Sequence, residues 1–204
     1  MGDTVDALDA EEATPARPAG DVAEDVAGYL AGDVAELAEH LVRVVGTRLL
    51  DPLEILLGDG SAVGGPRQRV RAGAGGWAAR LLGGDERAAA ETAGRLIGAL
   101  YPGDGPFDPP AGWWRTPLGQ AVARRVGHPG AEAVSYVVAA AMLGMTRQGV
   151  HDLAARGKLD RHPEGGVTTA SIRARLDRRE RRRPVEGTAG DPRQHSGAGW
   201  RATP

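Results

Sequence analysis

The side chains of this sequence that could recognise a ligand by hydrogen bonding are concentrated in one short segment, residues 146–152. A helix advances by about 100° per residue, so Gln148 and His151 would lie on one face and Val150 on the opposite face. A polar helical face that mixes donors and acceptors is suited to contacting the base edges in the major groove of duplex DNA. The candidate residues are Thr146, Arg147, Gln148, His151 and Asp152.

Each of these side chains matches a group that duplex DNA presents. Arg147 and Gln148 are the first choices for base contacts, because arginine can bridge guanine O6 and N7 and glutamine can bridge adenine N6 and N7. His151 is a further donor and Asp152 an acceptor for cytosine N4; the alternatives are a solvated His151 and an Asp152 that only repels phosphate. Thr146 would cap the helix and bring its hydroxyl and nearby backbone amides to a phosphate.

The residues around this segment predict two short helices joined by a tight turn. Ser135 can cap a helix over 136–143, and Thr146 can cap a second helix over 147–156. Gly144 lies between them and permits the left-handed backbone that such a turn requires. Two helices joined in this way form a helix-turn-helix, whose second helix, the recognition helix, enters the major groove.

The segment resembles the helix-turn-helix of bacterial repressors, in particular the MerR-like and excisionase-type winged variety. The small residue Ala140 stands where the two helices cross, and Gly144 stands at the turn. The apolar positions of the motif are occupied by Ala139, Leu143, Met145, Val150 and Leu153. The resemblance covers residues 135–183, about a quarter of the chain, and implies that the recognition helix contacts DNA.

The resemblance also implies a β-hairpin wing after the recognition helix. Residues 159–162 would form one strand, 163–166 the turn and 167–169 the returning strand, and a final helix would be capped by Ser171 or Thr169. In the winged family this hairpin lies beside the duplex. The residues it nominates for phosphate contact are Lys158, Arg161 and His162.

The charge of the chain is divided between its two halves. Residues 1–114 contain nine Arg against 19 Asp and Glu, whereas residues 115–183 contain 14 Arg and Lys against six Asp and Glu. Seven of these arginines belong to the final helix: Arg173, Arg175, Arg178, Arg179, Arg181, Arg182 and Arg183. Such a cluster predicts salt-dependent attraction to a polyanion; a solvated helix end and contact with the acidic N-terminal half are the alternatives.

The N-terminal half predicts a helical region of a different kind. Apolar residues recur at helical spacing from Asp21 to Leu49, Asp51-Pro52 begins a short helix through Leu57, and Asp85 caps a helix through Leu100. Further along the chain, Thr116-Pro117 begins another short helix, and the preceding pair Trp113 and Trp114 is expected to pack against the helices that follow; stacking on bases is the alternative. Residues 58–76, which are rich in glycine and arginine, suggest a flexible loop. The expected divisions are a disordered acidic tail (1–20), a helical domain for dimerisation or partner binding (21–101), a Pro/Gly linker (102–112), a winged helix-turn-helix domain (113–183) and a disordered tail (184–204).

The predicted fold is therefore mainly α, with a helical N-terminal region and a C-terminal winged helix-turn-helix that has a small β-hairpin. The chain has no cysteine, its histidines are scattered, and it has no phosphate-loop or HExxH spacing, so we expect neither an enzyme, a cofactor nor a metal site. No apolar run is long enough to span a membrane. We expect a cytoplasmic, nucleoid-associated bacterial transcription regulator that binds double-stranded DNA as a homodimer; the alternatives are an excisionase-like architectural factor and a protein-interaction adaptor.

Overall fold

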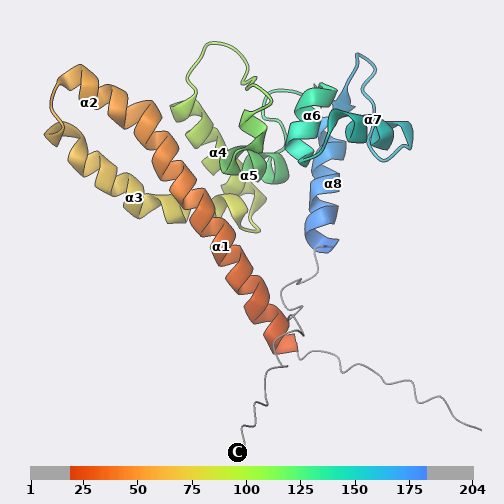
Figure 1. The fold of residues 1–204 in the computed structure, drawn as a ribbon, viewed down its shortest axis with the longest axis horizontal. Coiled ribbons are helices and arrows are strands. Elements are labelled where there is room, and N and C mark those ends of the chain that lie inside the picture. Colours follow the sequence, from red (N-terminus) through yellow and green to blue (C-terminus); the bar gives the residue numbers. More distant parts are fainter. Residues whose placement is uncertain (1–18, 183–204) are drawn as a thin grey trace, which may run out of the picture. The chain divides into compact units, whose positions relative to one another are not determined.

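The structure is a computed structural model that describes the backbone of residues 19–182 and the side chains of residues 30–182 (Figure 1). The predicted tails, apart from Ala19 and Gly20 at the start of the first helix, lie outside the described residues. Residues 30–182 belong to one compact unit, and the packing described below lies within it.

The fold is mainly helical, with a small two-stranded antiparallel sheet, in agreement with the predicted class. The helices are α1 (Ala19–Val45), η1 (Gly46–Leu50), α2 (Asp51–Leu57), α3 (Ser61–Leu82), α4 (Glu86–Leu100), η2 (Trp113–Arg115), α5 (Pro117–Arg125), α6 (Tyr136–Leu143), α7 (Arg147–Ala155) and α8 (Thr169–Arg182). The strands are β1 (Ala133–Val134) and β2 (Val167–Thr168).

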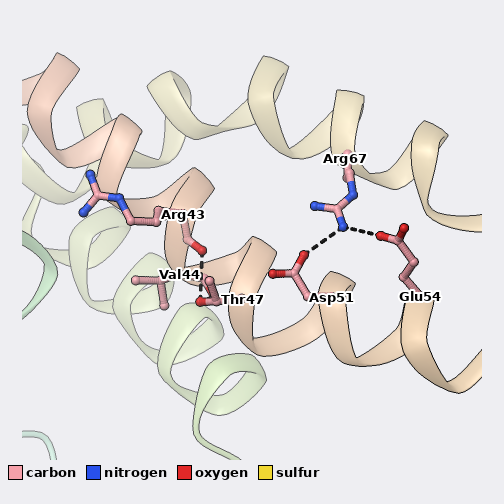
Figure 2. Close-up of polar contacts among 6 residues, drawn as sticks. All are labelled: Arg43, Val44, Thr47, Asp51, Glu54 and Arg67. Atoms are coloured by element: carbon pink, nitrogen blue, oxygen red, sulfur yellow. Dashed lines mark hydrogen bonds and ion pairs between the residues drawn. The ribbon is translucent and has the colours of Figure 1, made fainter. Parts of the chain in front are cut away.

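The amphipathic pattern after Asp21 forms α1 and continues into α2 through the π-helical segment η1. Thr47 donates its hydroxyl to the carbonyl oxygens of Arg43 and Val44, at 3.1 and 3.3 Å (Figure 2). Side-chain bonds of this kind compete with the regular helical pattern and locally alter it. The predicted end of α2 is confirmed, because Gly58 adopts the left-handed conformation there, with φ of 67°.

The prediction of a flexible loop over residues 58–76 is wrong, because α3 occupies most of that stretch. The buried side chains of α3 are Val63, Ala74, Ala78 and Leu81, and the last three recur at spacings of four and three residues. Two of these three are alanines, so the apolar periodicity was too weak to recognise among the glycines. Packing against the core stabilises α3, because its many glycines give it a low intrinsic helix propensity.

An ion-pair cluster holds α3 against α2. Arg67 on α3 donates to Asp51 at 2.8 Å and to Glu54 at 2.6 Å, both on α2. Figure 2 shows the guanidinium of Arg67 directed between these two carboxylates. The charge of this arginine is thus offset by two neighbouring acids.

The predicted start signals of α4 and α5 are confirmed. Asp85 accepts hydrogen bonds from the backbone amides of Arg87 and Ala88, and Thr116 accepts one from Gly119. Pro117 occupies the first helical position of α5, where its missing amide has no cost. Both helices therefore begin where local sequence chemistry places them.

The connector 102–112 packs against an aromatic residue that precedes it and against one that follows it. The ring of Phe107 lies 5.6 Å from that of Tyr101 and 5.0 Å from that of Trp113, and Trp113 stacks edge-on against Trp114 at 4.8 Å. Both tryptophans are buried, in agreement with the packing interpretation of this pair. A single core cluster includes residues of α1 and of each helix from α3 to α8.

The small sheet pairs β2 with β1, a strand that the sequence did not suggest. Its register places Ala133 opposite Thr168 and Val134 opposite Val167. The predicted strand over 159–162 is reduced to one bridge, between Arg161 and Val167. A strand of only two residues, Ala-Val, contains too little alternation to be recognised in the sequence.

Candidate nucleic-acid interface

The segment with the predicted recognition residues consists of α6, a short turn and α7. Ser135 caps α6 by accepting from the amide of Val138 at 3.3 Å, and Thr146 caps α7 by accepting from the amide of Gly149 at 3.1 Å. Gly144 between them has the left-handed conformation, with φ of 61°. The local geometry predicted for residues 135–155 is thus confirmed.

The turn is held by side chains from two other helices. Nε2 of Gln120, on α5, lies within hydrogen-bond distance of the carbonyl oxygens of Ala141 and Met142, at 3.1 and 3.2 Å. Arg179, on α8, donates to the carbonyl oxygen of Leu143 at 2.7 Å. The carbonyl groups at the end of a helix have no partner within that helix. Gln120 and Arg179 therefore position the turn, and no local sequence signal could have identified them.

The two faces of α7 differ as the helical geometry predicted. Val150 and Ala154 are buried in the core. Arg147, Gln148 and His151 are exposed. One face of α7 therefore anchors the helix, and the other presents hydrogen-bonding groups to solvent.

Two side chains on the exposed face of α7 contact other side chains of the protein, which the sequence analysis did not predict. Gln148 donates to the carboxylate of Asp152 at 2.9 Å, a pairing expected from their spacing of four residues. The ring of His151 lies 5.9 Å from that of Tyr136 on α6, which restricts its position. Arg147 makes no side-chain hydrogen bond or ion pair within residues 30–182. Of the predicted base-contact residues, Arg147 has the most freely available donor groups.

The residues predicted for phosphate contact lie in the segment that follows α7. Lys158 and Arg161 are exposed, whereas His162 is half-buried and accepts from the amide of Glu164 at 3.3 Å through Nδ1. The amide of His162 also donates to Gly166, at 3.2 Å, which closes a hairpin-like turn. Lys158 and Arg161 therefore lie at the surface, whereas one ring nitrogen of His162 is already used in a hydrogen bond within the protein.

A groove lies between the segment after α7 and one face of α8. It has a volume of about 630 Å³. Its lining residues are Gly157, Lys158, Asp160, Ser171, Ala174, Arg175, Arg178, Arg179 and Arg182. The α8 members recur at spacings of three and four residues, so helical periodicity could have grouped them. That Lys158 faces this group is a result of tertiary packing. We call this site the basic groove.

The basic groove is rich in uncompensated positive charge. Burial lowers the pKa of the Arg175 guanidinium from its ordinary value, and the neighbouring charges of Arg179 and Arg178 lower it further. The Nε atom of Arg175 is buried and has no hydrogen-bond partner within the described part of the chain. Repulsion between neighbouring cations, together with an unused donor, favours a negatively charged group in this groove.

The opposite side of α8 is anchored. Ile172 and Leu176 are buried in the core, and Arg173 donates to Glu86, at the start of α4, at 2.5 Å. Glu180 of α8 lies 3.6 Å from Arg125 of α5. The four arginines of the basic groove therefore lie on a helix that is fixed to the rest of the unit.

Neither a metal site nor a membrane-spanning helix is found in the part of the chain that the structure describes. Between residues 30 and 182, no three His, Asp or Glu side chains lie close enough together to hold a metal ion. No helix in the described ranges is both long and apolar enough to cross a lipid bilayer. Comparison of the chain with protein-family models, with curated proteins and with solved structures found no match.

Proposed function

We propose that this protein binds duplex DNA sequence-specifically, as a bacterial transcription regulator, with α7 in the major groove. The observation that supports this most directly is the geometry of α7. Its apolar face is buried, its cap is formed, and Arg147 and Gln148 are exposed in its first turn. The N-terminal residues of a recognition helix lie closest to the base edges.

The finer fold proposed for this region is a winged helix-turn-helix of the MerR-like or excisionase type. The hairpin-like turn after α7 stands where such a wing would be, and β2 pairs with β1 at its base. Arg161 is exposed on the hairpin and would contact phosphate. The excess of positive charge in residues 115–183 supports the attraction of this region to a polyanion.

In this proposal the N-terminal helices join two copies of the chain, since short half-site contacts need two copies for useful affinity. The surface of α2 is consistent with such a role. Ile55 and Leu56 are each 81% exposed, and Leu57 is 53% exposed. The same surface also favours a second candidate function, a protein-interaction adaptor, in which α2 would contact a different protein.

The experiment that tests the proposal is selection of bound sites from random duplexes, with the wild-type chain and with Arg147→Ala. We expect a preferred site with the wild type. Losing a base contact costs about 1–3 kcal/mol, so Arg147→Ala should bind that site roughly 5–150-fold more weakly and lose its preference at one or two base pairs.

The matched control is Arg69→Ala, which removes an exposed arginine of α3. Its preferred site and affinity should equal those of the wild type. A wild-type chain that binds no duplex in dilute buffer would contradict the proposal and favour the adaptor. Equal losses with Arg69→Ala and Arg147→Ala would show attraction by charge alone and contradict sequence-specific recognition.

A further inference from the structure

The lining of the basic groove is dominated by cationic side chains. Lys158, Arg175, Arg178, Arg179 and Arg182 line it, against a single acid, Asp160. The hydroxyl of Ser171 is already used, because it donates to the carbonyl oxygen of Thr168 at 2.9 Å. The free donors of the groove are therefore ammonium and guanidinium groups, which bind phosphate oxygens well.

Two partly buried arginines outside the groove have carboxylate partners. Arg67 pairs with two carboxylates of α2, and Arg173 pairs with Glu86. Within the described residues, Lys158, Arg175 and Arg178 form no ion pair. A concentration of cations without internal counter-charges indicates that the compensating anion comes from another molecule.

We propose that the basic groove binds a phosphate of the DNA backbone, on the strand opposite to the one contacted at the start of α7. This inference rests on the proposed function. It specifies which site of the protein contacts the DNA backbone and which of the two DNA strands is contacted there. The groove begins at Gly157 and Lys158, directly after the C-terminal end of α7. The Thr146 cap lies at the N-terminal end of the same helix.

The length of α7 supports this assignment. The helix has nine residues, which at 1.5 Å per residue span about 13 Å. The major groove of B-DNA is about 12 Å wide. A helix of this length that lies across the groove places its two ends near the two phosphate backbones. Thr146 then lies beside one strand and Lys158 beside the other.

Arg179 connects the basic groove to the helix-turn-helix. It lines the groove and donates to the carbonyl oxygen of Leu143, the last residue of α6. A phosphate bound beside Arg179 would therefore be held at a fixed position relative to the turn and to α7. The groove would set the depth and register of α7 on the duplex, as backbone contacts commonly do.

The test compares two double variants of equal charge in the full chain. Lys158→Gln with Arg178→Gln removes two exposed cations of the groove, and both residues lack hydrogen-bonded partners in the described part. Arg71→Gln with Arg95→Gln removes two exposed cations outside it, on α3 and α4. Circular dichroism and melting temperature should be the same for both variants and the wild type, which shows that all three are folded.

The readout is the slope of log Kobs against log salt concentration, measured on the preferred site. Each phosphate contact contributes about 0.9 to that slope, so the groove variant should lose about 1.8 if both cations contact phosphate. The preferred sequence should stay the same, because the base contacts remain. The control variant should keep the wild-type slope.

The outcomes separate this inference from the proposed function. If the wild type binds its site and the groove variant keeps the full slope, or the control loses as much, the groove assignment is overturned and the proposed function stands. If the wild type binds no duplex, the proposed function fails. Calorimetric binding of inorganic pyrophosphate by that wild type, lost in the groove variant, would show a phosphate groove for another ligand and overturn the assignment to DNA.

Discussion

Helices α3 and α8 are both rich in arginine, yet the fold surrounds Arg67 of α3 differently from the groove arginines of α8. On α3, Arg67 is neutralised by Asp51 and Glu54 of the neighbouring helix. On α8, Arg175 and Arg178 share the basic groove with Lys158, and Asp160 is the single acid of that lining. The number of arginines in a segment therefore does not identify a polyanion site. The decisive property is whether the fold supplies the counter-charges.

Helices α3 and α7 also differ in how strongly local residue types favour their formation. Helix α7 begins at a side-chain cap, Thr146, that is visible in the sequence. Helix α3 has no side-chain hydrogen bond from its capping residue, Gly60, and contains Pro66 and several glycines. Its stability must come from the side chains that it buries.

The largest effect is expected from Leu81→Ala in α3. Leu81 is fully buried, with 0% of its surface exposed. Removing a buried leucine side chain costs about 2–5 kcal/mol of the free energy of unfolding, measurable by urea denaturation. The control is Arg71→Ala on the same helix, whose side chain is exposed and whose removal should change stability by less than about 0.5 kcal/mol. Equal losses of stability in the two variants would contradict the view that side-chain packing stabilises α3.

A smaller loss is expected from Thr146→Ala, which removes the cap of α7. The Thr146 hydroxyl oxygen accepts from the amide of Gly149 at 3.1 Å. Losing such a cap costs about 1 kcal/mol, which thermal or urea unfolding can resolve. Thr146→Ser keeps the oxygen and should retain most of the stability. A serine variant as unstable as the alanine variant would refute the capping explanation.

A gain in stability is expected from Gly76→Ala in α3. Gly76 is exposed within the helix, and a Cβ added there would meet no atom within 4 Å. Alanine in place of glycine inside a helix stabilises by roughly 0.5–1 kcal/mol, so the melting temperature should rise. Gly144→Ala should lower it, because the φ of 61° at this turn is unfavourable for alanine. A destabilised Gly76→Ala variant would show that α3 tolerates no stronger local helix propensity.

The smallest effect is expected from pH. Burial, followed by the charge of Arg43, lowers the pKa of His40 below its ordinary value, although Glu36 raises it. The folded state therefore disfavours the protonated imidazole. The stability that His40 contributes is complete above the unfolded-state pKa of about 6.5 and decreases as the pH falls through that value. The melting temperature should decrease from pH 7.5 to 5.5, and less so in His40→Gln.

His128 sharpens this measurement. Burial lowers its pKa as well, while the charge of Asp108 raises it. Because both histidines act with the same sign, His40→Gln should remove only part of the decrease at low pH. An unchanged decrease in that variant would assign the pH dependence to groups other than His40.

Signals at the ends of helices predicted much of the fold. Asp85, Thr116, Ser135 and Thr146 each form the expected cap, and Gly144 adopts the left-handed conformation expected at the turn. Capping depends on a hydrogen bond between residues two or three apart in the chain. Such short-range chemistry can be predicted from the sequence without knowledge of the fold.

Other features could not be predicted in this way. The pairing of β1 with β2 joins residues more than thirty positions apart. Gln120 and Arg179 reach the end of α6 from distant helices. Contacts between residues so far apart in the chain depend on the packing of the whole unit, so the local pattern of residue types does not predict them.

The positions of the caps and turns of α4 to α7 follow from local residue types, and the exposed polar face of α7 follows from the helical repeat. That α3 is a helix, and that Lys158 meets Arg175 and Arg178 in one groove, depends on the packing of the whole unit. These two groups of features differ in the range of the contacts that set them. A cap or a helical face is set by neighbours within four residues, whereas burial and counter-charge are supplied by segments that only the folded chain brings together.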